Sequence, residues 1–452
     1  MQTSNSKFKR IALIVLTALL VLAGVLVFRY ALTAATVTDA VNYHMEQLEK
    51  ENANVDMFFV GGSRTYRSFD PTIFEKELGF KNVVNYGTPS QRPKLSYYMA
   101  KELLKTNKPK AIVIGSTFNG MMYKQDPHSF LFAQNRMTFP SQVECAIDHF
   151  GINTGILSLT GKSEYLKNLK VEKIKSNIAD KKFFRSGGKE KEIGNGHVGS
   201  DDELKNGNIV YGHLDKYEEA ANQDEAEKYF DKLVDLCIDS GAKVYLVTGP
   251  CSMTNIYRIT NYQESVDYYK NIAKEKGIKY FNMNYVKDRE NVLTDQEFMD
   301  LVHVNGRGGE ITSKILAEVI SKDIKGESTD SYFYKDANEL KKTVKRVVSI
   351  TTEEIYDNNS LRIVVGSLQN DNIKPIFRVL ASTQSVDEAY KEYDTLASWT
   401  TKSTFKFTLK SLKKYKTIRV EARTKDGYPG EITAYKLIKI KEKSNEETNG
   451  NN

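Results

Sequence analysis

The sequence predicts an α/β protein with a parallel sheet, followed by a β-sandwich and preceded by one transmembrane helix. Three patterns predict this: apolar strands ending in glycine that alternate with helical stripes, a C-terminal series of short alternating strands, and an uncharged N-terminal run. A length of 452 residues suits two or three folded units. Three cysteines exclude a disulfide scaffold and a Cys-rich zinc fold. A net charge of +7 does not by itself indicate nucleic-acid binding.

The N-terminal segment predicts a membrane anchor. Ile11–Phe28 contains no charged residue, and a helix of that length nearly spans a bilayer. Basic residues precede it within positions 1–10, so the positive-inside rule predicts a cytoplasmic tail there and an extracytoplasmic body. A cleaved signal peptide is the alternative reading. Residues 29–53 carry apolar side chains at near-helical spacing and predict a stalk helix.

The central part of the chain, 54–325, carries the strand–helix repeat. Its apolar strand runs are Val55–Val60, Asn82–Tyr86, Ala111–Ile114, Val244–Val247 and Ile278–Phe281. Ligands of parallel sheets bind beyond the carboxyl ends of the strands, so the informative residues should follow each run. Residues 151–225 are polar and interrupt the repeat, which indicates a lid or a partner-docking insertion.

The C-terminal part of the chain has a different sequence pattern. Short alternating runs separated by turn residues predict a β-sandwich over 335–442. It is either a spacer that adds stability or a module that binds polysaccharide. Residues 443–452 are polar and predict a disordered tail.

Two short segments could carry chemistry. Ser63 follows the first strand in Gly61-Gly62-Ser63-Arg64, where its hydroxyl would be exposed at the carboxyl edge of the sheet. A serine nucleophile needs a base, and the base needs an orienting acid. Among the six histidines, His303 stands just before the last helix, and Asp300 precedes it by three residues. Alone, the first segment is more typical of a simple turn and the second of a helix-capping loop.

Together the two segments resemble the SGNH/GDSL hydrolase family over roughly residues 54–322. The resemblance implies a flavodoxin-like three-layer α/β/α fold. It also implies that Ser63 is the nucleophile, His303 the base and Asp300 the acid that orients it.

The resemblance also indicates the oxyanion donors. Gly87 in Asn85-Tyr-Gly-Thr88 matches the family's block II glycine. The family's block III asparagine has no direct match, because the chain reads Gly115-Ser116-Thr117-Phe118-Asn119 after the third strand. Asn119 is displaced by two residues, and Ser116 or Thr117 could replace it.

The sequence around Ser63, together with the anchor, resembles a divergent branch that includes alginate and cellulose O-acetylation accessory proteins and D-alanine transfer proteins. This implies acyl transfer from Ser63 to a sugar hydroxyl or to water. The implied partners are a cell-surface polysaccharide or teichoic acid, the membrane and a membrane-bound O-acyltransferase. No cofactor and no metal motif is expected. Arg64 and Arg67 flank Ser63 and could bind an anionic polymer, or form a solvated pair beside a turn.

Three functions compete. The first is a membrane-anchored O-acyl esterase or transferase, the second an inactive scaffold that binds glycan, and the third a secreted lipolytic esterase. Intact Ser63, Asp300 and His303 favour activity over the scaffold. The anchor and the absence of an apolar lid stripe in 151–225 disfavour the lipolytic esterase.

Overall fold

The computed structural model describes most of the chain. The described residues are 2–32, 45, 48, 51, 53–125, 130, 136–160, 170–185, 192–204, 215–385, 392–427 and 434–441. Most of the predicted stalk helix over 29–53 and the whole predicted tail over 443–452 lie outside them.

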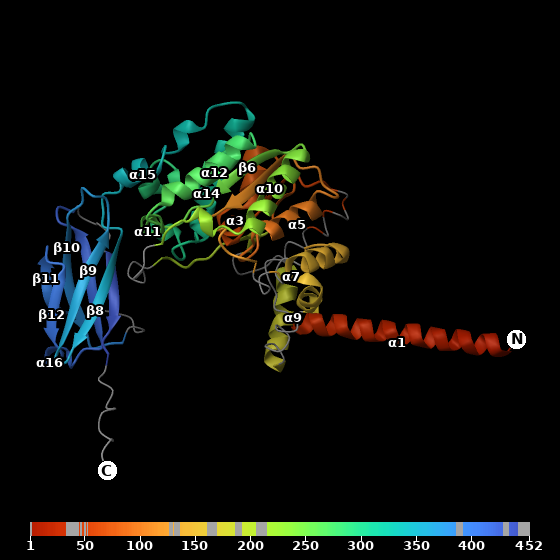
Figure 1. Ribbon diagram of the computed structural model, residues 1–452, viewed down its shortest axis with the longest axis horizontal. Helices are drawn as coiled ribbons and strands as arrows, with labels where there is room; N and C mark the ends of the chain where they lie inside the picture. Colours follow the sequence, from red (N-terminus) through yellow and green to blue (C-terminus); the bar gives the residue numbers. More distant parts are fainter. Residues whose placement is uncertain are drawn as a thin grey trace, which may run out of the picture.

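A five-stranded parallel sheet forms the centre of the molecule (Figure 1). Its strands are β1 (Met57–Val60), β2 (Val83–Asn85), β3 (Ala111–Ser116), β6 (Lys243–Thr248) and β7 (Lys279–Asn282). They lie in the order β2-β1-β3-β6-β7, and each neighbouring pair is parallel. This is a doubly wound order whose direction of winding reverses between β1 and β3. The predicted α/β fold with a parallel sheet is therefore confirmed.

Helices cover both faces of this sheet. On one face Phe58 and Val60 pack with α5 (Pro93–Leu103), α10 (Asp224–Asp239) and α12 (Tyr262–Glu275). On the other face Met57 and Phe59 pack with α4 (Pro71–Leu78) and α14 (Gly306–Ile324). Because successive side chains of a strand point to opposite faces, a strand covered on both sides must be apolar throughout. That requirement explains the uninterrupted run Met-Phe-Phe-Val in β1.

Shorter elements complete the α/β unit. A helix of six residues, α3 (Ser63–Ser68), follows β1 directly. The segment α7 (Phe139–Thr160) breaks at Gly151, whose φ is 74°. The others are α9 (Val171–Arg185), η1 (Glu219–Ala221), α11 (Met253–Arg258), η2 (Met283–Tyr285), α13 (Arg289–Val292), η3 (Asp295–Glu297), η4 (Asp330–Tyr332) and α15 (Ala337–Thr343).

One described part of the predicted insertion, residues 192–204, packs against the core. It contains a hairpin of β4 (Glu192–Gly194) and β5 (His197–Val198). His197 is fully buried, and its Nδ1 lies 2.9 Å from the carbonyl oxygen of Tyr66 in α3. The Ser200 carbonyl accepts a 2.8 Å hydrogen bond from the first amide of α14. The polar composition of 151–225 concealed this role, because the hairpin is held by hydrogen bonds to other segments.

Two antiparallel sheets form the C-terminal unit. One contains β8 (Ser349–Asp357), β9 (Ser360–Leu368) and β12 (Thr404–Thr408). The other contains β10 (Pro375–Ser382), β11 (Asp394–Thr400), β13 (Thr417–Thr424) and β14 (Ala434–Lys439), and a short helix, α16 (Leu409–Leu412), follows β12. Ile363 of the first sheet and Val379 and Val420 of the second belong to one buried cluster. The predicted sandwich is thus present as two sheets that share a core.

The N-terminal helix α1 (Gln2–Leu32) extends away from the sheet (Figure 1). Across the described residues, no helix combines the length and the apolarity needed to cross a membrane.

Two glycines allow β1 and β3 to approach one side chain at their carboxyl ends. A Cβ on Gly115 would lie 2.0 Å from Thr65 Oγ1, and one on Gly61 would lie 2.3 Å from the same atom. Gly61 also has a φ of 151°, which side-chain-bearing residues rarely adopt. Thr65 therefore occupies the space that two missing side chains leave, and this sets the position of α3.

We expect Gly115→Ala to destabilise the α/β unit by about 1–3 kcal/mol, because the new methyl group overlaps Thr65. Calorimetry should show its unfolding transition several degrees lower. Adding Thr65→Ala removes the overlapping hydroxyl and should recover part of the loss. An unchanged transition in the single variant would contradict this packing.

Candidate active site

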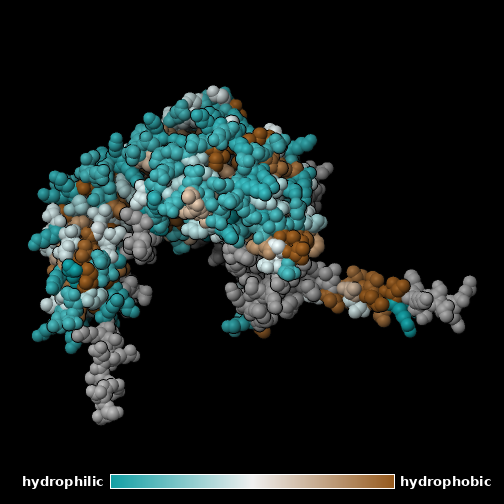
Figure 2. All heavy atoms as spheres, viewed as in Figure 1, coloured by the Kyte–Doolittle hydropathy of each residue, from teal (hydrophilic) through white to brown (hydrophobic). Residues whose placement is uncertain are grey.

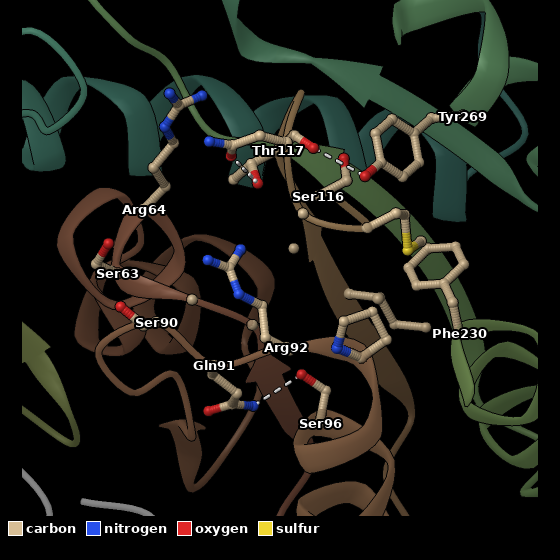
Figure 3. A pocket seen from close by; sticks show the side chains of 18 of the residues that line it. Ser63, Arg64, Ser90, Gln91, Arg92, Ser96, Ser116, Thr117, Phe230 and Tyr269 are labelled. Atoms are coloured by element: carbon tan, nitrogen blue, oxygen red, sulfur yellow. Dashed lines mark hydrogen bonds between the residues drawn. The ribbon is translucent and has the colours of Figure 1, made fainter. Parts of the chain in front are cut away.

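A cavity of about 200 Å³ opens at the carboxyl ends of β1 and β3. Ser63, which begins α3, lines it from the β1 side, and Ser116 and Thr117 line it from the end of β3 (Figure 3). This is the point where the winding of the sheet reverses and where the connections on either side diverge. The cavity therefore lies where the topology of a doubly wound sheet creates a crevice.

Ser63, His303 and Asp300 form one chain of hydrogen-bonding contacts. Ser63 Oγ lies 2.7 Å from His303 Nε2, and His303 Nδ1 lies 2.8 Å from Asp300 Oδ2. The imidazole is mostly buried, with 20% of its side chain exposed, while the Asp300 side chain is 46% exposed. The three predicted residues are thus within hydrogen-bond reach of one another, although Ser63 and His303 are 240 positions apart.

Asp300 holds both the loop and the imidazole. Its Oδ1 accepts 2.8 Å hydrogen bonds from the amides of Val302 and His303. Burial opposes the charged form, but the hydrogen bonds from His303 and from the two amides outweigh it and lower the pKa of Asp300. A carboxylate only accepts hydrogen bonds, so the proton on His303 belongs on Nδ1. The lone pair of Nε2 then faces Ser63 Oγ.

The start of α14 fixes this loop to the rest of the unit. Asn305 caps the helix, with its Oδ1 accepting from the Gly308 amide at 3.0 Å. Its Nδ2 donates to the carbonyl oxygens of Gln296 and Asp202. Gly308 permits close contact, since a Cβ there would lie 2.1 Å from the Glu297 carbonyl oxygen. His303 is therefore held from both sides, by Asp300 and by the helix that follows.

Gly87 does not have the position expected of an oxyanion donor. Its amide donates to Asn85 Oδ1 at 3.0 Å, and Gly87 is absent from the cavity wall. Asn85 itself is buried and donates to the carbonyl oxygens of Thr65 and Phe69. Because its amide is already used, Gly87 contributes close packing beside α3 and not a donor to the cavity.

All three residues expected after β3, Ser116, Thr117 and Asn119, line the cavity. Thr117 Oγ1 lies 3.4 Å from Asn119 Oδ1, and the Thr117 carbonyl accepts from Tyr269 at 2.8 Å. The Ser116 hydroxyl is held 2.6 Å from Thr248 Oγ1 and is less available. Asn119 and Thr117 therefore remain candidate donors by position.

The segment after β2 supplies cavity residues that the sequence reasoning missed. Ser90, Gln91 and Arg92 all line the cavity, and Ser90 has a φ of 51°, a left-handed conformation (Figure 3). Gln91 is held by Thr88 and Ser96, through bonds of 2.8 and 3.0 Å. A non-glycine residue with positive φ beside a cavity often marks a functional site. The available signal was Pro89-Ser90 after the second strand, a turn dipeptide at the carboxyl edge.

The two arginines that were expected to bind substrate lie in different places. Arg64 lines the cavity. Arg67 does not: its Nη1 lies 3.2 Å from Met299 Sδ, and its guanidinium group lies 5.3 Å from the centre of the Tyr66 ring. Being close to Ser63 in sequence did not determine which side of α3 each arginine occupies.

Comparisons with known proteins find similarity among solved structures. No family model matches the chain, and no curated protein matches it. Among solved structures, a GDSL-like lipase from Bacteroides thetaiotaomicron is 14% identical, with 63% of this chain and 99% of that chain covered and a TM-score of 0.31. A two-domain esterase active on acetylated mannans is 11% identical, with 88% and 94% covered and a TM-score of 0.28. Similarities of this size do not define an activity for this chain.

We expect Asp300→Ala to loosen the loop that carries His303. The amides of Val302 and His303 would lose their acceptor, and each lost bond is worth about 1 kcal/mol. Their hydrogen exchange should therefore become about 5-fold faster or more. Asp300→Asn retains an Oδ1 acceptor and should leave this exchange close to wild type. Equal acceleration in both variants would contradict the assigned role of Oδ1.

Proposed function

We propose that the protein is a serine O-acyl esterase or acyltransferase. One observation carries the proposal: a serine hydroxyl 2.7 Å from a histidine Nε2 whose other nitrogen is 2.8 Å from a carboxylate, on the wall of a cavity. A nucleophile, a base and an orienting acid in this arrangement support acyl transfer. Hydrolysis and transfer to a sugar hydroxyl use the same three residues.

The reaction would proceed in two halves. His303 Nε2 takes the proton of Ser63 as Oγ attacks the ester carbonyl carbon, and Asp300 stabilises the resulting imidazolium. The protonated His303 then gives its proton to the leaving alcohol, and the acyl group remains on Ser63. In the second half, His303 takes a proton from water or from an acceptor hydroxyl as that oxygen attacks the acyl carbon, and it then returns the proton to Ser63 Oγ as the bond between Ser63 and the acyl group breaks. The Thr65 amide donates to the Gly62 carbonyl oxygen at 2.9 Å, whereas the first two amides of α3, those of Ser63 and Arg64, have no acceptor within the helix and are available to the oxyanion.

The size of the cavity favours a short acyl group. Its volume is about 200 Å³, and the apolar residues of its wall include Ile114, Met121, Phe230 and Leu233. We therefore propose acetyl or a similarly small acyl group, carried by a cell-envelope polysaccharide or teichoic acid. A membrane-bound O-acyltransferase would be the source of the acyl group in the transfer reaction.

We also propose that the N-terminal helix anchors the protein in the cell membrane, with the body outside. Two features support this: Ile11–Phe28 carries no charge, and the described large aliphatic side chains of α1 are exposed (Figure 2). Leu16 is 54% and Leu20 65% exposed. An exposed apolar helix is stable only if lipid or another apolar surface covers it.

Replacing the nucleophile tests the enzymatic proposal. We expect Ser63→Ala to lower kcat/KM for p-nitrophenyl acetate by about 10⁴-fold or more, with folding intact. Ser68→Ala is a matched control: Ser68 lies in the same helix, is buried, and its hydroxyl contacts no described polar partner. Its activity should stay within about 3-fold of wild type. Equal rates for wild type and Ser63→Ala would exclude the proposed mechanism.

Introducing two charged residues into the N-terminal helix tests the proposed membrane anchor. The wild-type protein should remain in the membrane pellet after alkaline carbonate extraction of bacterial cells. The double variant Leu16→Lys/Leu20→Lys should be released, since each lysine costs about 2.5–3.5 kcal/mol at the centre of a membrane helix. Leu16→Ile/Leu20→Ile keeps the apolar surface and should stay in the pellet. Release of the wild-type protein from the membrane pellet would contradict the proposed anchor.

A further inference from the structure

We propose that the substrate carries an anionic group, a carboxylate or a phosphate, that binds between Arg64 and Arg92. That the ligand is the ester substrate rests on the proposed function. The anion site itself is argued from the two side chains and from the other residues of the cavity wall.

Arg64 is a cation at the cavity wall with no described counter-charge. It is 6% exposed and follows Ser63 directly in α3. Within the described part of the chain, no acceptor forms a hydrogen bond or an ion pair with its guanidinium group. Because Arg64 lines the cavity, its charge is available to a ligand bound there.

Arg92 approaches the same cavity from another element. It caps the N-terminus of α5, and its side chain extends into the cavity between Ser63 and Phe230 (Figure 3). Its Nε is buried and has no hydrogen-bond acceptor in the described structure. Burial lowers the pKa of Arg92, and the groups that oppose this are the phenols of Tyr123 and Tyr269 rather than a carboxylate. Its guanidinium group lies 5.3 Å from the centre of the Tyr123 ring.

The cavity wall contains no counter-charge. Its described residues include two arginines and His303 but neither aspartate nor glutamate. Elsewhere buried arginines have acceptors: Arg346 Nε lies 2.9 Å from Glu290 and its Nη1 3.4 Å from Asp295, and Arg289 donates to the carbonyl oxygens of Leu293 and Cys251. The missing partners at the cavity are therefore a local feature, next to the proposed nucleophile.

An anionic ligand would satisfy both groups. Guanidinium binds carboxylate and phosphate through paired, charge-assisted hydrogen bonds. Because Arg64 is adjacent to Ser63 and Arg92 lies across the cavity, the anion must be close to the ester that Ser63 attacks. The substrate class is thus an acylated sugar acid or an acylated polyol phosphate, and a neutral acylated glycan would leave both arginines unpaired.

The test measures inhibition of the full-length protein in detergent. The reporter is p-nitrophenyl acetate, and the probes are glucuronate, glycerol phosphate and neutral methyl glucoside. We expect at least one anion to inhibit competitively and methyl glucoside to be at least about 10-fold weaker. Stronger inhibition by glucuronate would identify a carboxylate substrate, and stronger inhibition by glycerol phosphate a phosphate substrate.

Variants assign the effect to the two arginines. Arg64→Gln and Arg92→Gln should each raise the inhibition constant of the effective anion about 10-fold or more, while Arg92→Lys, which keeps the charge, should raise it less. Arg67→Gln removes the same charge from a side chain that contacts Met299 and Tyr66 outside the cavity, and should leave that constant unchanged. Calorimetric binding of the same anion to Ser63→Ala provides a readout that needs no turnover.

Each outcome decides one of the two proposals. Hydrolysis that depends on Ser63 without anion binding would overturn the anion site and leave the proposed function standing. Anion binding that depends on the arginines, without hydrolysis, would overturn the proposed function and leave the anion site standing. Inhibition by the neutral and anionic probes to the same degree, or equal weakening in Arg67→Gln, would also overturn the anion site.

Discussion

The hydrogen bond between Ser63 and His303 depends on two distant parts of the chain meeting within 2.7 Å. The turn after β1 holds one partner, and the loop before α14 holds the other. Each is fixed by close contacts that leave no room for a Cβ, with the Thr65 side chain at Gly61 and Gly115 and with the Glu297 carbonyl oxygen at Gly308. The buried hairpin that contains His197 joins the two parts, since it contacts α3 and the first residues of α14. The chemistry of the site is thus a consequence of close packing at the edge of the sheet.

The features that sequence could predict are those set by local pattern. Apolar runs that end in glycine predicted the parallel sheet, because strands covered on both faces have few polar residues. Ser63, Asp300 and His303 could be selected because a nucleophile at a strand end and a histidine before the last helix are each recognisable within a few residues. Their meeting then follows from the topology of the sheet.

The features that the sequence could not predict depend on the direction in which a side chain or an amide points. Gly87 is next to the site, yet its amide is taken by Asn85, a partner two residues away. Arg64 and Arg67 both follow Ser63 within four residues, but of the two only Arg64 lines the cavity. Arg92 belongs to a separate segment and comes to the cavity through the fold of α5. The polar hairpin around His197 gave no periodic signal, because it is buried through hydrogen bonds and not through an apolar face.

The central claim is that Ser63 carries the acyl group during turnover. It is tested most directly by mixing the protein with p-nitrophenyl acetate, quenching with acid within milliseconds to seconds, and mapping the modified peptide by mass spectrometry. The account predicts one acetyl group on Ser63, which accumulates and then decays as substrate is consumed. Turnover with no acetyl group on Ser63 at any time, or with the group on another residue, would contradict it.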